Sequence, residues 1–160
     1  GILTTAAKAE LLEPEELRRV TVLMTTLNKG ARDVMVKYRV HACTDVTGFG
    51  LLGHGLEMAQ GSDTELHLQT AGLDFLPRAL DFAGMGILPA GMYRNRSFAA
   101  DFVEPGQDAM YDPQTSGGLL IAVHPDDADA MYAELQTAVP SAQRVGTVEA
   151  YRGGGRIFLE

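Results

Sequence analysis

The sequence predicts an α+β fold, a layered α/β sandwich built around a mixed sheet. Helical spacing of apolar residues alternates irregularly with short strand-like runs, and the last two runs look like an antiparallel hairpin, which disfavours a purely parallel sheet. The chain has 160 residues, of which 46% are hydrophobic. That is enough for one core and too little for two, so we expect residues 1–160 to form a single domain.

The composition excludes several classes of function. Thirteen Lys and Arg face 21 Asp and Glu, for a formal charge of -8. A phosphate-backbone binder needs a concentrated positive surface, so nucleic acid is not expected as a partner. The one cysteine, Cys43, allows neither an internal disulfide nor a thiolate metal site, which suits the cytoplasm. No apolar run approaches the roughly 20 residues that span a bilayer, and no membrane association is expected.

The first third of the chain predicts a strand followed by two helices. Residues 2–6 are β-prone and start abruptly, as though the chain were cut from something longer. Pro14 between three glutamates marks a helix start, because the carboxylates face the positive end of the helix dipole. That helix should end near residues 28–30, and a second short helix should span residues 31–38.

The middle of the chain predicts a strand, a helix and a second strand. Residues 40–46 form a buried strand that enters a glycine-rich turn, residues 51–60 a helix, and residues 64–69 a strand with alternating pattern. Gly53 and Gly55 lie inside the helix, where each glycine costs about 1 kcal/mol relative to alanine. Two such residues suggest that another part of the backbone packs closely against it.

The second half begins with a short helix at residues 77–82. A long irregular stretch should follow, because it carries Gly84, Gly86, Pro89 and Gly91. The remaining expected elements are a strand at residues 119–123, a helix beginning near Pro125, and a terminal hairpin of residues 144–149 and 156–159 around three glycines.

The first chemically suggestive motif is Asp-Val-Thr-Gly-Phe-Gly at residues 45–50. A carboxylate, Asp45, and a hydroxyl, Thr47, stand at a strand end just before the amide N–H groups of a helix N-terminus, an arrangement suited to a metal-bound phosphate. The alternative is a tight turn in which Gly48 and Gly50 supply unusual backbone angles and Asp45 or Thr47 caps the helix. Spacing alone favours the turn.

The second motif is Asp-Pro-Gln-Thr-Ser-Gly-Gly at residues 112–118. Ser116, Gly117 and Gly118 can wrap an oxyanion with their backbone amides. They can equally be a turn that redirects the chain into the following strand, and spacing alone favours this too.

Other candidate residues carry weaker signals. Cys43 has no basic neighbour and is expected to be a buried, inert thiol. Arg94 and Arg96 can bind a phosphate or sulfate, or stay solvated, and solvation is slightly favoured. The four histidines lack zinc-ligand spacing and are expected to be structural: His41, His54, His67 and His124.

Taken together, residues 44–54 and 112–120 resemble the two C-terminal signatures of the selenophosphate synthetases, also called selenide, water dikinases. Residues 2–6, Leu27 with Asn28, and residues 153–156 extend the similarity over nearly the whole chain. The resemblance implies the fold of the C-terminal domain of aminoimidazole ribonucleotide synthetase. It also implies that residues 1–160 are one C-terminal domain of a two-domain enzyme.

Such an enzyme makes selenophosphate from selenide and ATP with Mg²⁺, and releases AMP and phosphate. By resemblance, Asp45 is a magnesium ligand. The residues expected near phosphate or another anion are Thr47, Gly48 and Gly50 and, more loosely, Ser116 and Gly117. Magnesium prefers carboxylate oxygen and bridges phosphate groups, so the chemistry agrees with the motif.

The family's reactive cysteine or selenocysteine, its catalytic lysine and its other magnesium ligands belong to the N-terminal half. No catalytic residue is therefore expected in this chain, and the chain alone should bind ATP weakly and make no selenophosphate. Expected partners are the N-terminal domain, ATP, selenide and, for the full protein, a second copy. Two alternatives stay open: a sister enzyme of the superfamily, such as the purine cyclo-ligase or the hydrogenase-maturation dehydratase, and a non-catalytic binding module.

Overall fold

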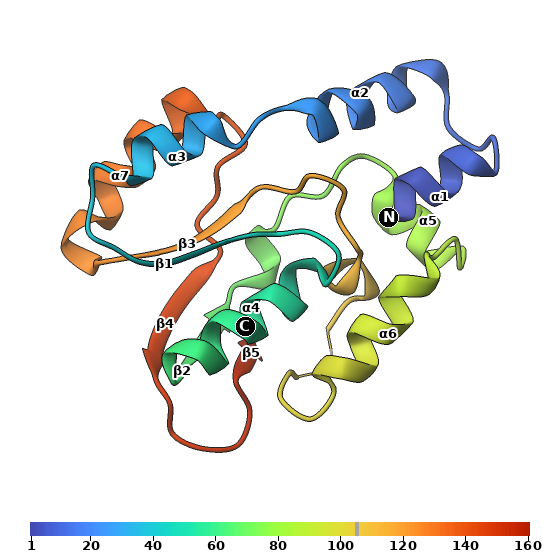
Figure 1. Cartoon of the computed structure of the whole chain (residues 1–160). Coiled ribbons are helices and arrows are strands. Elements are labelled where there is room, and N and C mark those ends of the chain that lie inside the picture. The colour runs from blue at the N-terminus through green and yellow to red at the C-terminus, as the bar shows by residue number, and fades with distance from the viewer. Residues whose placement is uncertain (105) are drawn as a thin grey trace.

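Helices and short strands alternate along the chain in the computed structural model, which describes residues 1–104 and 106–160 (Figure 1). The helices are α1 (Ile2–Lys8), α2 (Pro14–Thr25), α3 (Lys29–Met35), α4 (Gly50–Ser62), α5 (Ala79–Gly84), α6 (Ala90–Ala99) and α7 (Pro125–Ala138). The strands are β1 (Val40–Asp45), β2 (Thr64–Leu68), β3 (Leu119–Val123), β4 (Gly146–Ala150) and β5 (Ile157–Leu159). Two 3-10 turns are η1 (Thr70–Gly72) and η2 (Asp108–Tyr111). The predicted α+β fold is confirmed.

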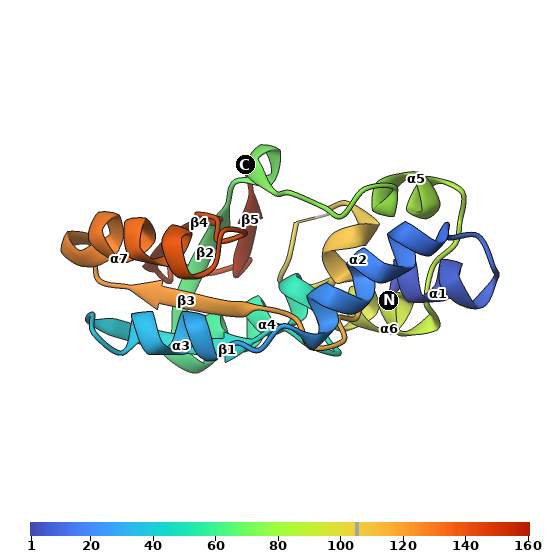
Figure 2. The same cartoon turned by 90° about the horizontal axis from the view of Figure 1, so that it is seen from above.

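Two small sheets form the centre of the fold. Strands β1 and β3 pair antiparallel, and the register places Asp45 opposite Leu119. In the second sheet β2 lies in the middle, antiparallel to β4 and parallel to β5. Helices α3 and α7 lie together beside the first sheet, and α4 contacts β1 of the first sheet and β2 and β5 of the second (Figures 1 and 2).

Each group of elements has its own set of buried side chains. The main core joins α4, α6 and the second sheet through Leu52, Leu56, Met92 and Ile157, all fully buried. A second cluster joins α1, α2 and α5, which lie together at the other end of the molecule (Figure 2). A third joins α3 and α7. Among the described residues, no helix is long and apolar enough to cross a membrane.

Close packing explains the glycines inside α4. A Cβ on Gly55 would lie 3.3 Å from the Leu66 side chain and 3.4 Å from that of Ile157. Gly55 therefore makes room for side chains of the second sheet, whereas a Cβ on Gly53 would meet the Phe49 side chain at the start of the same helix; the expected close approach of another backbone segment is not what these glycines serve.

The predicted strand at residues 2–6 is wrong, because these residues form α1. Its β-prone residues nevertheless place Ile2, Leu3 and Ala6 on one helical face, which packs against the buried Phe82. The Asp112 carboxylate accepts a hydrogen bond of 2.8 Å from the Ile2 backbone N–H and so satisfies an N-terminal amide of the helix.

The irregular stretch expected after Gly84 is also partly wrong, because residues 90–99 form the helix α6. Pro89 stands at its N-cap, and the helix buries Met92, Asn95 and Ala99. The polar Asn95 in the middle of this buried stripe, next to Arg94 and Arg96 in sequence, hides the helical period.

The terminal hairpin is the third correction. Strands β4 and β5 follow each other in sequence but do not pair, because β2 lies between them. The buried Glu65 of β2 accepts a hydrogen bond of 3.0 Å from the Arg152 backbone N–H, which holds the connecting segment across the sheet. Sequence spacing cannot show that a third strand occupies the middle position.

Candidate functional site

Asp45 ends β1 and its side chain is exposed. Along this strand the exposed residues alternate, so His41, Cys43 and Asp45 share one face. Within residues 1–104 and 106–160, the Asp45 carboxylate makes no hydrogen bond or ion pair. It is therefore free to bind a group from outside the described chain.

The turn after Asp45 is held by its own backbone. The Gly50 N–H donates to the Thr47 carbonyl at 3.0 Å, and Gly50 has a φ of 70°, which glycine adopts without strain. Helix α4 begins there with Phe49 as N-cap and without a side-chain cap. The predicted unusual angle is thus confirmed at Gly50, while capping of the helix by Asp45 or Thr47 is wrong.

The structure brings the two motifs together. The Val46 N–H donates to the Gly118 carbonyl, and the Gln114 N–H donates to the Thr47 carbonyl, both at 2.9 Å. A Cβ on Gly117 would overlap the Val46 carbonyl oxygen. Gly117 is therefore explained by close backbone approach, and we call the contact between residues 45–50 and 112–118 the glycine junction.

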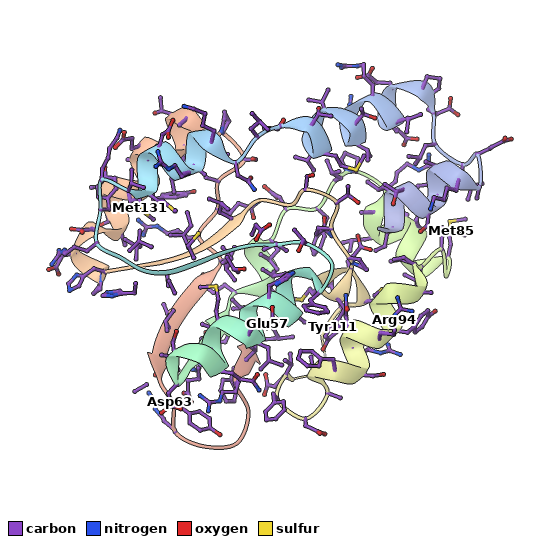
Figure 3. The ribbon with its side chains drawn as sticks, viewed as in Figure 1. Glu57, Asp63, Met85, Arg94, Tyr111 and Met131 are labelled. Atoms are coloured by element: carbon purple, nitrogen blue, oxygen red, sulfur yellow. The ribbon has the colours of Figure 1, made fainter. Side chains whose placement is uncertain are left out.

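Two asparagines hold the glycine junction from outside. The Asn95 side-chain amide donates to the carbonyl oxygens of Gly48 and Tyr111, each at 2.9 Å, and the Asn28 amide donates to the Gly117 carbonyl at 2.9 Å. Tyr111 lies between α4 and α6, which also carry Glu57 and Arg94 (Figure 3). Sequence reasoning missed Asn95; a buried amide inside an apolar helical stripe is the signal that could have found it.

His54 supports the same turn from inside α4. Its Nε2 atom lies 3.1 Å from the Thr47 hydroxyl and 3.4 Å from the Phe49 backbone nitrogen, and its Nδ1 atom lies 2.9 Å from a Glu57 carboxylate oxygen. The side chain is nearly buried. His54 therefore has the structural role that the sequence predicts, since it contacts Thr47 and the Phe49 backbone at the start of α4.

The remaining residues of the second motif divide between internal and outward roles. Asp112 is buried, and its carboxylate accepts hydrogen bonds from Ile2 and from the Gln114 side chain. The Asp112 carboxylate is therefore occupied by hydrogen bonds within the chain. Ser116 is exposed and has a φ of 51°, an angle that non-glycine residues adopt rarely.

Arg94, Arg96 and Cys43 do not form a binding cluster. Arg96 pairs with Asp108 at 2.9 Å, whereas Arg94 is exposed on α6. Cys43 is exposed, so the expectation of a buried thiol is wrong. Partial burial of the sulfur and the charge of Asp45 raise the pKa of the Cys43 thiol, which disfavours the reactive thiolate.

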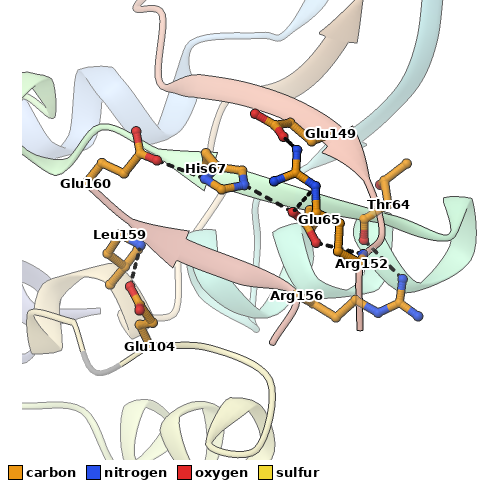
Figure 4. Close-up of polar contacts among 9 residues, drawn as sticks. All are labelled: Thr64, Glu65, His67, Glu104, Glu149, Arg152, Arg156, Leu159 and Glu160. Carbon is orange, nitrogen blue, oxygen red and sulfur yellow. Dashed lines mark hydrogen bonds and ion pairs between the residues drawn. The ribbon is translucent and has the colours of Figure 1, made fainter. Parts of the chain in front are cut away.

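One group of side chains in the described part of the chain has metal-ligand spacing, and it lies on the second sheet. It consists of Glu65, His67 and Glu149 (Figure 4). The Arg152 guanidinium pairs with Glu149 and lies 3.8 Å from Glu65. Burial raises the pKa of the Glu65 carboxyl, but the Arg152 N–H and His67 outweigh it and lower that pKa overall. Arg152 thus already supplies the positive charge that a metal ion would bring to these carboxylates.

Asp45, Gly48 and Ser116 of the glycine junction are exposed. Two hollows of about 340 Å³ lie elsewhere, one beside Tyr132 and Arg144 and the other beside Leu73 and Arg78. Neither is lined by a residue of the two motifs. The arrangement offers one side of a binding site.

Comparisons with known proteins bear on the family and the fold of this chain. The family model described as "AIR synthase related protein, C-terminal domain" matches residues 1–158. A selenide, water dikinase of Treponema denticola is 48% identical over 145 residues, which is 87% of this chain and 41% of that protein. One of Citrifermentans bemidjiense is 40% identical over 163 residues, 99% of this chain and 48% of that protein. The chain thus spans less than half the length of these relatives.

A solved structure supports the fold. The hydrogenase maturation protein HypE superposes with a TM-score of 0.55 over 84% of this chain and 38% of its own, at 18% identity. At this identity the likeness concerns the fold alone. With a family model that matches all but the last two residues, the chain belongs to the C-terminal domain family of the AIR synthase related proteins.

Proposed function

We propose that this chain is the C-terminal domain of a two-domain selenophosphate synthetase, which makes selenophosphate from selenide, ATP and water and releases AMP and phosphate. The relatives named selenide, water dikinase support the family. The observation that carries the site is the Asp45 carboxylate, exposed and without a partner among the described residues at the end of β1. The glycine junction behind it fixes where this carboxylate stands.

The donor set at this turn fits a magnesium ion that is shared with another domain. Mg²⁺ takes oxygen ligands and keeps several waters, so one carboxylate and a nearby hydroxyl are suitable contributions but do not hold the ion alone. Asp45 would ligate the ion directly, and Thr47 lies two residues further on. When bound, the ion would offset negative charge on the nucleotide phosphates.

Gly48 leaves room for a phosphate beside the start of α4. A Cβ at this position would meet no atom of the chain within 4 Å, and the residue is exposed. Packing within the chain therefore does not require glycine here. A phosphate approaching the start of α4 does benefit from it, since the helix N-terminus favours negative charge.

The exposure of Asp45, Gly48 and Ser116 at the glycine junction supports a division of labour. We infer that the N-terminal half supplies the nucleophile, the lysine and the remaining magnesium ligands, and that this chain closes one side of the nucleotide site. The isolated chain should then bind ATP weakly and form no selenophosphate. Appreciable turnover by the purified 160-residue chain would contradict this division.

The decisive experiment is Asp45→Ala in the two-domain enzyme, with AMP formation measured while Mg²⁺ is varied. We expect the Mg²⁺ concentration for half-maximal rate to rise on the order of tenfold or more, because a ligand is lost. Asp101→Ala is the matched control, since it removes another exposed carboxylate. An unchanged Mg²⁺ dependence in Asp45→Ala would exclude Asp45 as a ligand.

A further inference from the structure

The hydrogen bonds of His54 determine which of its ring nitrogens carries the proton. The Phe49 backbone N–H can only donate, and it points to Nε2 at 3.4 Å. Nε2 must therefore be the acceptor. With Nε2 as acceptor, the ring proton resides on Nδ1, which donates to the Glu57 carboxylate at 2.9 Å.

This tautomer fixes the direction of the Thr47 hydroxyl. Because Nε2 is an acceptor, the hydroxyl at 3.1 Å must donate its single proton to the ring. Only the oxygen lone pairs of Thr47 then remain for other groups. Thr47 can accept a hydrogen bond or bind a cation, but it has no proton left to donate.

The environment of His54 keeps this arrangement in place. His54 is only 9% exposed. Its ring lies 5.3 Å from the Phe49 ring, centroid to centroid, and the Phe49 ring stacks on Phe98. Glu57 lies one turn further along α4 and accepts from Nδ1, so it holds the ring in this orientation.

We propose that His54 is a positioning residue that makes Thr47 an acceptor toward a hydrated divalent cation. Phosphate oxygens at neutral pH mainly accept hydrogen bonds, whereas metal-bound water donates them. A threonine whose proton is already donated therefore suits the cation and its water, and does not suit a phosphate oxygen. The cation part rests on the proposed function, while the hydrogen-bond direction rests on the described contacts alone.

A spectroscopic experiment tests the hydrogen-bond direction without any metal. In the metal-free two-domain enzyme with ¹⁵N-labelled histidine, the His54 ring should show the Nδ1–H tautomer, with Nε2 unprotonated. His54→Gln identifies the signal by its loss. An Nε2–H tautomer would overturn the proposal, and it would leave the role of Asp45 untouched.

A pair of variants tests the consequence for the cation. The Oε1 atom of a glutamine can reach the position of Nε2 and accept from Thr47, whereas the thioether sulfur of methionine is only a weak acceptor. His54→Met should raise the Mg²⁺ concentration for half-maximal AMP formation by about tenfold, and His54→Gln should restore most of the loss. Urea unfolding checks that both variants are folded, and His41→Gln is the control for an exposed histidine.

Equal Mg²⁺ dependence in His54→Met and His54→Gln would overturn the proposal. Failure of the proposed function has a different signature. In that case Asp45→Ala leaves the Mg²⁺ dependence unchanged, while the His54 ring still shows the Nδ1–H tautomer.

Discussion

Two carboxylates near strand ends, Asp45 on β1 and Glu65 on β2, have opposite environments: Asp45 is exposed and Glu65 is buried. Glu65 is 3% exposed and accepts hydrogen bonds from the Arg152 backbone and from His67. It also stands directly opposite Glu149 in the strand register, a repulsive pair that Arg152 offsets. Asp45 is exposed and has no such partners among the described residues.

The difference teaches that ligand spacing alone does not identify a metal site. The group around Glu65 has the spacing but is already neutralised by an arginine of the same chain. The Asp45 turn has only one carboxylate, but that carboxylate is available. The backbone of the turn is held by two hydrogen bonds across the glycine junction and by the Asn95 side chain. A metal site shared with another domain should resemble the Asp45 turn, with an exposed carboxylate, unpaired among the described residues, on a well-held backbone.

Breaking the glycine junction should give the largest effect. Gly117→Ala places a Cβ against the Val46 carbonyl oxygen, so we expect the free energy of unfolding to fall by about 3 kcal/mol, as measured by urea unfolding. Gly118→Ala is the matched control, because a Cβ there meets no atom within 4 Å. Equal stability of the two variants would mean that the two motifs do not touch as described.

Removing the Asn95 clamp should have the next largest effect. Asn95→Ala leaves two carbonyl oxygens without their donor, and we expect a loss of about 2 kcal/mol in the free energy of unfolding. Ser97→Ala, on the exposed face of the same helix, should stay within about 0.5 kcal/mol of the parent protein. A loss of similar size in both variants would argue against a specific clamp.

The charge network on the second sheet predicts a smaller, pH-dependent effect. The hydrogen bond to Glu160 raises the pKa of His67 above its usual 6.5; burial opposes this shift, and Glu65 adds to it. Protonated His67 thus stabilises the fold fully below about pH 6.5, and this contribution is lost as the pH rises through the raised pKa. Unfolding measured from pH 6 to 9 should show this loss in the parent protein and not in His67→Gln.

Changing Asp45 should affect stability least. Asp45→Asn removes a charge that has no partner among the described residues, so the free energy of unfolding should change by less than about 0.5 kcal/mol. Thermal or urea unfolding measures this directly. A clear loss of stability would show that Asp45 serves the fold, and the contrast with Glu65 would disappear.

Local signals in the sequence were sufficient for most elements. The strand β3 has the predicted bounds, because five apolar residues stand between a glycine pair and the proline that opens α7. The same kind of signal located β1, β2 and α4. The apolar pattern of each of these elements is visible along the chain itself, although the strands pair with distant partners.

The missed features depend on partners that are distant in sequence. Helix α6 buries Asn95 only because carbonyl groups of Gly48 and Tyr111 meet it there. The place of β5 depends on β2, and the role of His54 depends on a turn that the second motif supports. The sequence therefore pointed to the two motifs, while their mutual contact and its asparagine clamps required the structure.

The strand order of the second sheet also bears on how the protein folds. Arg156, just before β5, bonds to the Thr64 carbonyl across 92 positions of sequence, and β1 pairs with β3 over a similarly long loop. The chain loses conformational entropy when such distant segments come together, and the stabilising contacts form only afterwards. Refolding should accordingly be slow compared with helical proteins of this size, and neither sheet can assemble from the first hundred residues alone.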